Sequence, residues 1–533
     1  MTKEAYPTQN LEQMLWVADY PLHGARKFPD RRAIIGDNDT VTYAELERKS
    51  ERFVDFLHER GIAPGSRIAY LGKNSELFFP VFFGCLRSGV ILVPINWRCA
   101  PGEIAFILRD SGSQLAIYDA EFAEKIAQAL PEIPDPPRLL ITTSEDGESL
   151  RRILLNPATS SRGESRERTA DACALLMYTS GTTGNPKGVM LSHKALSIAR
   201  HVEVGSPDWA DWDDDDIILS AMPNFHVGGL SWMLIGLMRS LTCVLTADAS
   251  PATLLRLMRR HAVTRTFMVP TVVRMILEQV SADASPPPPI RTIYYGASTM
   301  DVALLSQCIE TLGCGFAQYF GMTENCGTVT FLPPRDHDVH RPEKLRSVGK
   351  ALPGMTIEIR DATGRPLPPH TPGEIWIQSP TLTSGYWNRP EATGAVLVDD
   401  WYRSGDGGYL DEEGYLYLTD RIKDMIISGG ENVYPAEVEQ ALRLHPAVND
   451  VAVVGIPDPT WGEIVAAVVE WHVDQSTSLA ELRAFASKYI ASYKLPKVLE
   501  SVSHLPRTAT GKIQRVKVRE CVTDGFADKN SEK

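Results

Sequence analysis

The 533-residue sequence lacks the patterns that mark several large classes of protein. Its eight cysteines are scattered with no C-x-x-C pair, which argues against a disulfide framework and against a zinc site. No apolar run reaches the roughly 18 residues that span a bilayer, and LSWMLIGLM at 230–238 is about half that length. The N-terminal MTKEAYPTQN has no basic stretch followed by an apolar one, so no signal peptide is predicted. These absences predict a soluble, cytoplasmic protein.

The sequence also lacks an excess of basic residues. A formal net charge of −13 argues against nucleic-acid binding, because phosphates require a basic surface. Any anionic ligand must therefore be held by local donors. Arg256, Arg259, Arg260 and Arg265 are a local exception and could form a basic face. A solvated helix is the favoured interpretation, with peripheral membrane contact as the alternative, and the choice between monomer and homodimer stays open.

Helix and strand patterns alternate from residue 40 onward. In the first helix, residues 43–60, Thr42 and Glu45 can form a capping box at the start and Gly61 ends it. After it, strands are expected at 67–72, 90–95 and 114–119, and helices at 74–89 and 101–112. Strands that alternate with helices indicate parallel sheets covered on both faces. The predicted fold class is therefore α/β.

The pattern changes near residue 421. Residues 373–420 alternate like antiparallel strands with glycine turns. The following residues predict helices at 435–445 and 479–494 and strands at 450–456 and 463–471. Such a unit of roughly 110 residues has a normal domain size. We expect a large domain over 1–421 and a small α+β domain over 422–533, meeting near DRIKD.

The stretch YTSGTTGNPKG at 178–188 has the composition of a phosphate-binding loop. It is not a P-loop, because Asn185 and Pro186 separate Gly184 from Lys187. A Gly/Thr/Ser connector between two strands can fold its N–H groups into an anion-holding concavity, although a polar hairpin turn would explain the stretch equally well. The candidate residues for the β- and γ-phosphates of a nucleotide are Thr179, Ser180, Gly181, Thr182, Thr183, Gly184 and Lys187.

Three further motifs contain polar groups that suit a nucleotide. In QYFGMTENCG, Glu324 could hold a Mg²⁺ that bridges phosphates. In YRSGD, Asp406 could accept hydrogen bonds from ribose hydroxyls, and RTATGK ends in Lys512. Each residue alone has an ordinary explanation: a solvated acid, a turn former and a solvated lysine.

As a set, the motifs resemble those of the adenylate-forming superfamily in order and rough spacing. They are TSGTTGNPKG, NFHVGG, FGMTE, YRSGD, DRIKDMIISGGENVYPAEVE and PRTATGK, and the resemblance runs from about Thr42 to about Gln514. The superfamily includes acyl-CoA synthetases, firefly luciferase and peptide-synthetase adenylation domains. ENVYPAEVE and GYWNRPEAT are most similar to bacterial fatty-acid–CoA ligases and their aryl-acid relatives.

The resemblance implies two half-reactions. A carboxylate attacks the α-phosphate of ATP to give an acyl-adenylate and pyrophosphate, and the CoA thiol then displaces AMP. Two negatively charged reactants must meet, so catalysis depends on positioning and on fixed positive charge.

The resemblance also implies roles for individual residues. The catalytic residues would be Lys512, bridging carboxylate and α-phosphate, Thr323, donating to that phosphate, and Glu324, binding Mg²⁺. The other nucleotide contacts would be the phosphate-loop residues already named, Gly296, Ala297 and Ser298 beside the adenine, Phe320 stacking on it, Gly321 and Met322, and Asp406 and Arg421 at the ribose. Lys423 would be the hinge of a mobile C-terminal domain, and Ser428, Gly429 and Gly430 would meet the pantetheine of CoA.

The acid is the least determined part of the prediction. His226 would lie near the substrate carboxylate, and the absence of an acidic residue in FHVGGLSW disfavours an amino acid. A medium- or long-chain fatty acid is favoured, since the glycines Gly229, Gly296, Gly321 and Gly327 could leave room for it. A benzoate, cyclohexanecarboxylate or hydroxycinnamate is the runner-up, and loading of a carrier protein is a further alternative. The acyl contacts would be His226, Val227, Gly229, Gly321 and Gly327, with Trp232 and Met233 as further lining candidates; Tyr319 stands where many relatives have glycine.

Overall fold

The computed structural model covers the whole chain. The residues that it describes are 14–144, 149–157, 169–179, 186–206, 211–283, 286–297, 300–421, 424, 426–428, 431–433, 435–458, 461–487, 489–490, 492–507 and 511–530. Contacts divide the chain into two compact units, each built from separated segments. Unit 1 comprises Met1–Thr356 and Ile377–Tyr402, and unit 2 comprises Ile357–Trp376 and Arg403–Lys533. The sequence predicts a boundary at 421/422, between a large domain and a small domain that moves during the reaction. This boundary stays a prediction.

One sheet of unit 1 has the order β6-β5-β3-β4-β7-β8. Its strands are β3 (Arg67–Leu71), β4 (Ile91–Ile95), β5 (Leu115–Tyr118), β6 (Leu139–Thr142), β7 (Cys173–Thr179) and β8 (Lys187–Ser192). All neighbours are parallel except β7 and β8, which form an antiparallel pair. Ile104 and Leu108 of α4 (Pro101–Ser111) and Ile126 of α5 (Ala123–Ala129) belong to the core cluster of this sheet. The predicted alternation of helices and parallel strands is confirmed here.

The expected capping box is present in α2 (Tyr43–Glu59). The Glu45 amide donates to Thr42 Oγ1 at 3.2 Å, and the Thr42 amide donates to Glu45 Oε2 at 2.9 Å. Gly61 follows with φ +66°, a conformation that a glycine adopts without a steric penalty. The capping bonds set where the helix begins, and the turn at Gly61 follows its end.

The second sheet of unit 1 has the order β15-β14-β13-β12-β11-β9-β10-β1-β2. It is parallel from β13 to β1, and the outer strands β14 and β2 are antiparallel to their neighbours. The strands are β1 (Arg32–Ile35), β2 (Thr40–Thr42), β9 (Ile217–Ser220), β10 (Thr242–Leu245), β11 (Arg265–Met268), β12 (Thr292–Gly296), β13 (Gly315–Met322), β14 (Gly327–Leu332) and β15 (Lys350–Ala351).

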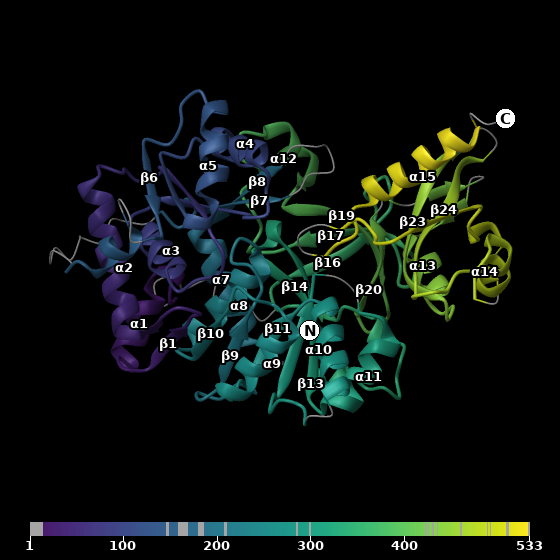
Figure 1. Cartoon of the computed structure of the whole chain (residues 1–533), viewed down its shortest axis with the longest axis horizontal. Helices are drawn as coiled ribbons and strands as arrows, with labels where there is room; N and C mark the ends of the chain where they lie inside the picture. The colour runs from purple at the N-terminus through teal and green to yellow at the C-terminus, as the bar shows by residue number, and fades with distance from the viewer. Residues whose placement is uncertain are drawn as a thin grey trace. The chain divides into compact units, whose positions relative to one another are not determined.

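Helices α9 (Pro251–Arg260), α10 (Pro270–Asp283) and α11 (Val302–Leu312) supply apolar side chains to the core cluster of this second sheet. Figure 1 shows these helices beside the strands. The other helices of unit 1 are α1 (Tyr20–Lys27), α3 (Phe78–Arg87), α6 (Leu150–Leu155), α7 (His193–Gly205), α8 (Val227–Met238) and α12 (Pro390–Val396).

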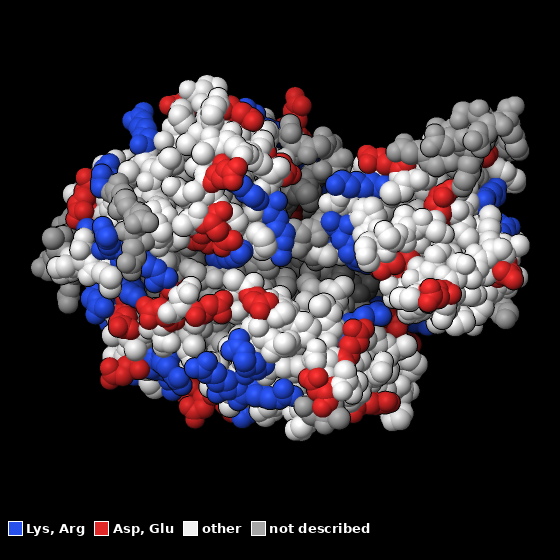
Figure 2. Space-filling view, viewed as in Figure 1, with Lys and Arg blue, Asp and Glu red and all other residues white. Residues whose placement is uncertain are grey.

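The prediction that Arg265 belongs to a basic helix face is wrong. Helix α9 ends at Arg260, and Ala262 with φ +49° turns the chain into β11, where Arg265 is 1% exposed. Arg256, Arg259 and Arg260 are exposed, and Figure 2 shows Lys and Arg side chains gathered over α9. Burial and the charges of Arg260, Arg32 and Arg256 lower the pKa of His261. The basic face therefore exists without Arg265.

Unit 2 contains the predicted α+β arrangement. Strands β23 (Val448–Asp458) and β24 (Gly462–Trp471) form a long antiparallel pair. Strand β25 (Val498–Val502) runs parallel to β24. Strand β21 (Ile426–Ser428) pairs with β24 at Gly462 and with β22 (Glu431–Val433). Helices α13 (Pro435–Arg443) and α14 (Leu479–Ala486) pack in one core, and α15 (Arg515–Asn530) packs in a second core formed by alternate residues of the same strands. Helices thus cover both faces of the sheet.

A further sheet has the order β16-β17-β19-β18, with β20 paired to β19. Its strands are β16 (Thr356–Arg360), β17 (Gly373–Gln378), β18 (Leu397–Val398), β19 (Trp401–Leu410) and β20 (Leu416–Arg421). The division into units falls inside β16, β17 and β19. Within the ranges that the structure describes, no helix is both long and apolar enough to cross a bilayer.

Candidate functional site

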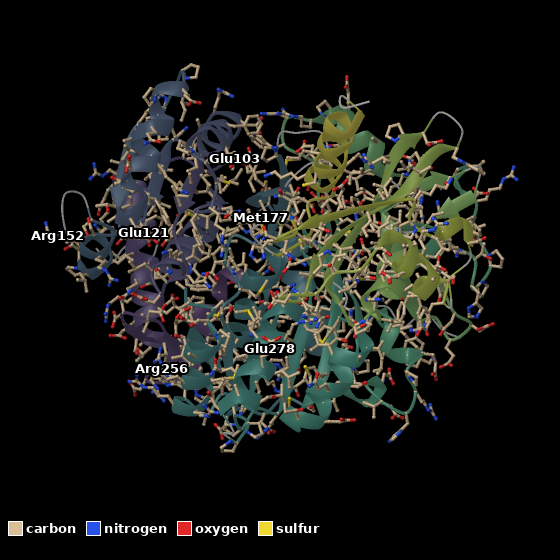
Figure 3. The ribbon with its side chains drawn as sticks, turned by 45° about the vertical axis from the view of Figure 1, so that its right-hand side comes forward. Glu103, Glu121, Arg152, Met177, Arg256 and Glu278 are labelled. Carbon is tan, nitrogen blue, oxygen red and sulfur yellow. The ribbon has the colours of Figure 1, made fainter. Side chains whose placement is uncertain are left out.

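The hairpin β7–β8 flanks the expected phosphate loop. Thr179 pairs with Lys187 at the open end, and Met177, labelled in Figure 3, is buried opposite Val189. Thr179 and Lys187 are partly exposed. The other residues expected to contact phosphate, Ser180, Gly181, Thr182, Thr183 and Gly184, lie outside the described residues. The predicted strands on either side of the motif are confirmed.

The motif FGMTE lies where β13 turns into β14. Cys326 with φ +55° and Gly327 with φ +125° reverse the chain after the short 3₁₀ turn Thr323–Asn325. Phe320, Met322, Thr323 and Glu324 are partly exposed and Gly321 is exposed. The polar residues proposed for the α-phosphate and for Mg²⁺ are therefore adjacent and accessible at the end of one strand.

A connecting segment, residues 383–387, joins this turn to β8. The Thr383 amide donates to the Glu324 carbonyl at 2.7 Å, the Met190 amide donates to the Gly385 carbonyl at 3.0 Å, and the Trp387 amide donates to the Gly188 carbonyl at 2.8 Å. These main-chain bonds hold the phosphate-loop strand and the Glu324 turn side by side.

Tyr386 of the 383–387 segment links two of the predicted site residues. Its hydroxyl donates to Glu324 Oε1 at 2.8 Å, and Lys187 Nζ lies 5.2 Å from the centre of its ring. Lys187 and Glu324, far apart in the sequence, thus meet around a single side chain. Tyr386 lies in the GYWNRPEAT motif, which predicts no role for it, and in the structure Gly385 before it has φ +122°.

The expected adenine contacts lie on two neighbouring strands. Gly296 at the end of β12 pairs with Tyr319, the residue before Phe320 on β13. A Cβ at Gly296 would lie 2.6 Å from the Tyr319 carbonyl oxygen, so only glycine fits. Ala297 has φ +66° and turns the chain away from the sheet, and Ser298 lies outside the described residues.

The residues expected to contact the acid lie at the start of α8. His226 occupies the N-cap position, with its ring centre 4.4 Å from that of Phe225, and Val227 begins the helix; both are partly exposed. The Phe267 ring lies 3.1 Å from a Cβ built at Gly228 and 3.4 Å from one built at Gly296. The start of α8 and the end of β12 are therefore joined through Phe267.

The glycines of this region fit close backbone contacts. A Cβ at Gly229 would lie 2.4 Å from the Pro223 carbonyl oxygen, and one at Gly321 would lie 2.0 Å from the Gly327 carbonyl oxygen. At Gly327 the neighbours would be Arg200 and Ser231 side chains, each at 3.1 Å. Because these positions are glycines, neighbouring backbone and side-chain atoms can approach them closely. The expectation that the glycines leave room for an acyl tail stays a prediction.

Tyr319 fills space that a glycine would leave open. Its ring centre lies 5.3 to 5.6 Å from those of Tyr294, Phe331 and Phe267. Burial raises the pKa of its hydroxyl, while part of the residue stays exposed. Trp232, 1% exposed, packs on Tyr294 and donates to the Leu219 carbonyl at 2.9 Å, and Met233 is fully buried. Trp232 therefore belongs to the core.

The site residues of unit 2 occupy two places. Asp406 and Arg421 are direct partners across β19 and β20, which puts the two residues expected at the ribose opposite one another. Lys512 is exposed and follows Gly511, whose φ is +80°, in a loop closed by the bridge between Arg507 and Ile513.

The CoA and hinge candidates are covered only in part. Ser428 is buried at the end of β21. Lys423, Gly429 and Gly430 lie outside the described residues, so their roles rest on the sequence.

The chemistry of the donor set fits Mg²⁺ held mainly by a nucleotide. Over the described part of the chain, no three His, Cys, Asp or Glu side chains gather in a way that could hold a metal ion. Glu324 offers a single carboxylate, and Mg²⁺ commonly takes one or two carboxylates together with phosphates and waters.

The cysteine of this turn is fully buried. Burial raises the pKa of the Cys326 thiol to about 12, which favours the protonated, unreactive form at neutral pH. The polar groups of the turn are suited to binding and orienting phosphates.

Comparisons with known proteins cover most of the chain. Residues 22–387 match the pattern of the family described as AMP-binding enzyme, and residues 437–512 match the AMP-binding enzyme C-terminal domain. A fatty acid–[acyl-carrier-protein] ligase from Streptomyces coeruleorubidus is 37% identical over 93% of this chain and 94% of its own length. A long-chain-fatty-acid–CoA ligase from Mycobacterium tuberculosis is 37% identical over 90% of this chain and 93% of its own length.

A solved structure is similar over nearly its full length. The o-succinylbenzoate coenzyme A synthetase from Bacillus subtilis, in complex with ATP and magnesium ion, superposes with a TM-score of 0.81 at 32% identity. The match covers 94% of this chain and 99% of that one. The large α/β part and the small α+β part expected from the sequence are both present in this match.

Proposed function

The chain belongs to the family of AMP-binding enzymes, and we propose that it joins a medium- or long-chain fatty acid to CoA. Membership confirms the motif-based prediction of the adenylate-forming superfamily, acyl-CoA synthetase branch. The protein is an AMP-forming acid–thiol ligase that uses ATP and CoA as substrates together with Mg²⁺.

The observation that supports the site assignment is the convergence of Lys187 and Glu324 on Tyr386. An ammonium group and a carboxylate that meet at one tyrosine side chain support a shared role toward one polyphosphate. When bound, Mg²⁺ supplies charge neutralisation of the phosphate oxygens. Glu324 would hold the metal ion, Thr323 would donate to the α-phosphate, and Lys187 would orient the departing pyrophosphate.

Two residues of unit 2 are assigned to different steps. Lys512 would bridge the carboxylate and the α-phosphate during adenylate formation. Lys423 would be the hinge, since a domain rotation needs a position that absorbs a large backbone change. Asp406 and Arg421 would fix the ribose, and residues 428–430 would contact pantetheine.

A crossed experiment tests these two assignments. Lys512→Ala should abolish acid-dependent pyrophosphate release but spare thioester formation from a supplied acyl-adenylate. Lys423→Pro should do the reverse, because proline fixes φ. Equal losses in both half-reactions for either variant would contradict its assignment.

The choice of acid rests on the relatives and on the side chains near His226. Two relatives are named for fatty acids, and the partly exposed Val227 adds an apolar side chain next to His226. The alternative is an aryl or cyclic acid. A flat substrate could stack on the partly exposed ring of Tyr319, which packs beside Phe267. The similar solved structure is also named for an aryl acid.

The acceptor and the acid can be determined in one assay. Purified protein with ATP and Mg²⁺ is given C8 to C16 fatty acids, benzoate, cyclohexanecarboxylate or a hydroxycinnamate, with either CoA or a holo carrier protein. We expect thioester formation on CoA with the fatty acids. Turnover restricted to aryl acids would select the alternative, transfer only to the carrier protein would reassign the acceptor, and release of pyrophosphate with amino acids alone would overturn the proposal.

The basic face formed by Arg256, Arg259 and Arg260 is proposed to be a solvated surface, with contact to an anionic membrane as the alternative. The exposed side chain of Arg256, labelled in Figure 3, lies at the periphery of the molecule. Sedimentation with anionic but not neutral vesicles, reduced by Arg256→Glu and Arg260→Glu, would select the alternative. A cytoplasmic location is part of the same proposal.

A further inference from the structure

Tyr386 has a fixed position between the two charged groups of the candidate site. Its residue is 7% exposed, and its amide donates to Thr393 Oγ1 at 2.9 Å. The residues on either side of it are bonded to β8, and Thr383 is bonded to the Glu324 turn and, through its hydroxyl, to the Met190 carbonyl at 2.7 Å. The main chain of the 383–387 segment is therefore held independently of the Tyr386 hydroxyl.

The hydroxyl makes a contact that the packing of the ring does not require. It donates to Oε1 of Glu324 at 2.8 Å. A hydrogen bond to an ionised acceptor is short and strong, and it restricts rotation of the carboxylate. Among the described residues no hydrogen bond to Oε2 of Glu324 is found, so this oxygen can face a cation.

We propose that Tyr386 is a positioning residue that orients Glu324 for the nucleotide-bound magnesium. The inference rests on the proposed function, in which Glu324 holds that metal ion. Mg²⁺ requires near-octahedral geometry at short distances, so a carboxylate free to rotate would bind it less well than one held in a single orientation. The ring of Tyr386 also faces the Lys187 ammonium, so one side chain sets the spacing of both charged groups.

A conservative substitution separates this role from a structural one. Tyr386→Phe keeps the ring, its contact with Lys187 and the main-chain bonds of the segment, and it removes the bond to Glu324. Tyr43→Phe is the matched control, because the Tyr43 hydroxyl is also buried and donates to a main-chain carbonyl, that of Leu241, at 2.6 Å.

The measurement is nucleotide binding by calorimetry, with ATP in excess Mg²⁺ and with ATP in EDTA. Tyr386→Phe should weaken binding of the magnesium complex roughly tenfold, as for one lost bond to a charged group, and leave metal-free ATP binding unchanged. The same substitution in a Glu324→Ala background should have no further effect. Tyr43→Phe should leave both affinities at the wild-type value.

Each other outcome overturns the inference. Equal affinities of Tyr386→Phe and wild type for the magnesium complex would show that the hydroxyl does not position Glu324, while the proposed function would stand. A parallel loss of metal-free ATP binding, or a loss that persists in the Glu324→Ala background, would assign Tyr386 a structural role. Absence of ATP binding by the wild-type protein would refute the proposed function and this inference with it.

Discussion

Replacing Arg265 by methionine should destabilise unit 1 strongly, whereas the same change at Arg260 should not. The Arg265 side chain donates through Nε to Asp216 at 2.8 Å, through Nη2 to the Asp211 carbonyl at 2.6 Å and through Nη1 to the Tyr294 hydroxyl at 3.0 Å. The side chain of Asp216 is completely buried, so its charge cannot be rescued by water when Arg265 is removed.

The magnitude follows from the charge left behind. Breaking a buried ion pair from one side costs about 3–5 kcal/mol. Arg291, half exposed, lies 3.4 Å from the other oxygen of Asp216 and offsets part of this loss. We therefore expect the free energy of unfolding to fall by about 3 kcal/mol for Arg265→Met at pH 7, and by less than about 0.5 kcal/mol for the exposed Arg260→Met.

The pH dependence gives a second test. Burial acts to raise the pKa of Asp216, but hydrogen bonds from Thr264 and Arg265 hold it below its usual value. In the wild type, this carboxylate stabilises the fold above its unfolded pKa, and that contribution is lost as the pH falls. Without Arg265 the pKa of Asp216 should rise, so the carboxyl becomes neutral on acidification and the deficit of the variant shrinks.

Urea unfolding at pH 7 and pH 4.5, with hydrogen exchange of amides in β9 and β11 as a local probe, measures both effects. A deficit below about 1 kcal/mol at pH 7 would mean that loss of the ion pair is not the main cause of any destabilisation. A deficit that grows on acidification would contradict the assigned charge of Asp216.

Two further predictions concern a buried histidine and a tightly packed glycine. Burial lowers the pKa of His337 from 6.5 to about 4, so the neutral form is favoured in the folded state. The free energy of unfolding should therefore fall by up to about 3 kcal/mol as the pH is lowered from 6.5 to 4. Urea titrations of His337→Gln should lack this component. Gly321→Ala should lower the unfolding midpoint by the equivalent of about 2 kcal/mol or more, because its Cβ would meet the Gly327 carbonyl oxygen at 2.0 Å; Gly394→Ala in α12, where nothing lies within 4 Å, should be neutral or slightly stabilising. A flat wild-type profile between pH 4 and 6.5, or equal midpoints for the two glycine variants, would contradict these expectations.

Local signals predict the elements well. The Thr42–Glu45 capping box, the alternation of strands and helices up to Tyr118, and the strands around the phosphate loop depend on neighbours in the sequence, and all are present. The same holds for the strands and helices after residue 435, except that the helix expected over 479–494 ends at Ala486. Period and turn chemistry are properties of short segments, so a single sequence contains them.

Contacts between distant residues are what the sequence does not reveal. The spacing groups Arg265 with Arg256 and Arg260, because nothing in it shows that Ala262 turns the chain inward. Tyr386 belongs to the GYWNRPEAT motif, but the motif does not reveal its role, since its bond to Glu324 spans 62 residues. The sequence pattern changes at one point near residue 421, whereas each compact unit is built from two segments that are separated in the sequence.

The 383–387 segment has a consequence for biosynthesis. Tyr386 bridges to Val189, so the ribosome adds roughly 200 residues between the two partners, which at about 5–20 residues per second takes about 10–40 s. During that interval the edge of β8 is uncovered in the nascent polypeptide, and Glu324 emerges before the tyrosine that accompanies it. A chain that terminates prematurely after β14 would expose this edge permanently, and it would be a natural target for chaperones that capture unpaired strands.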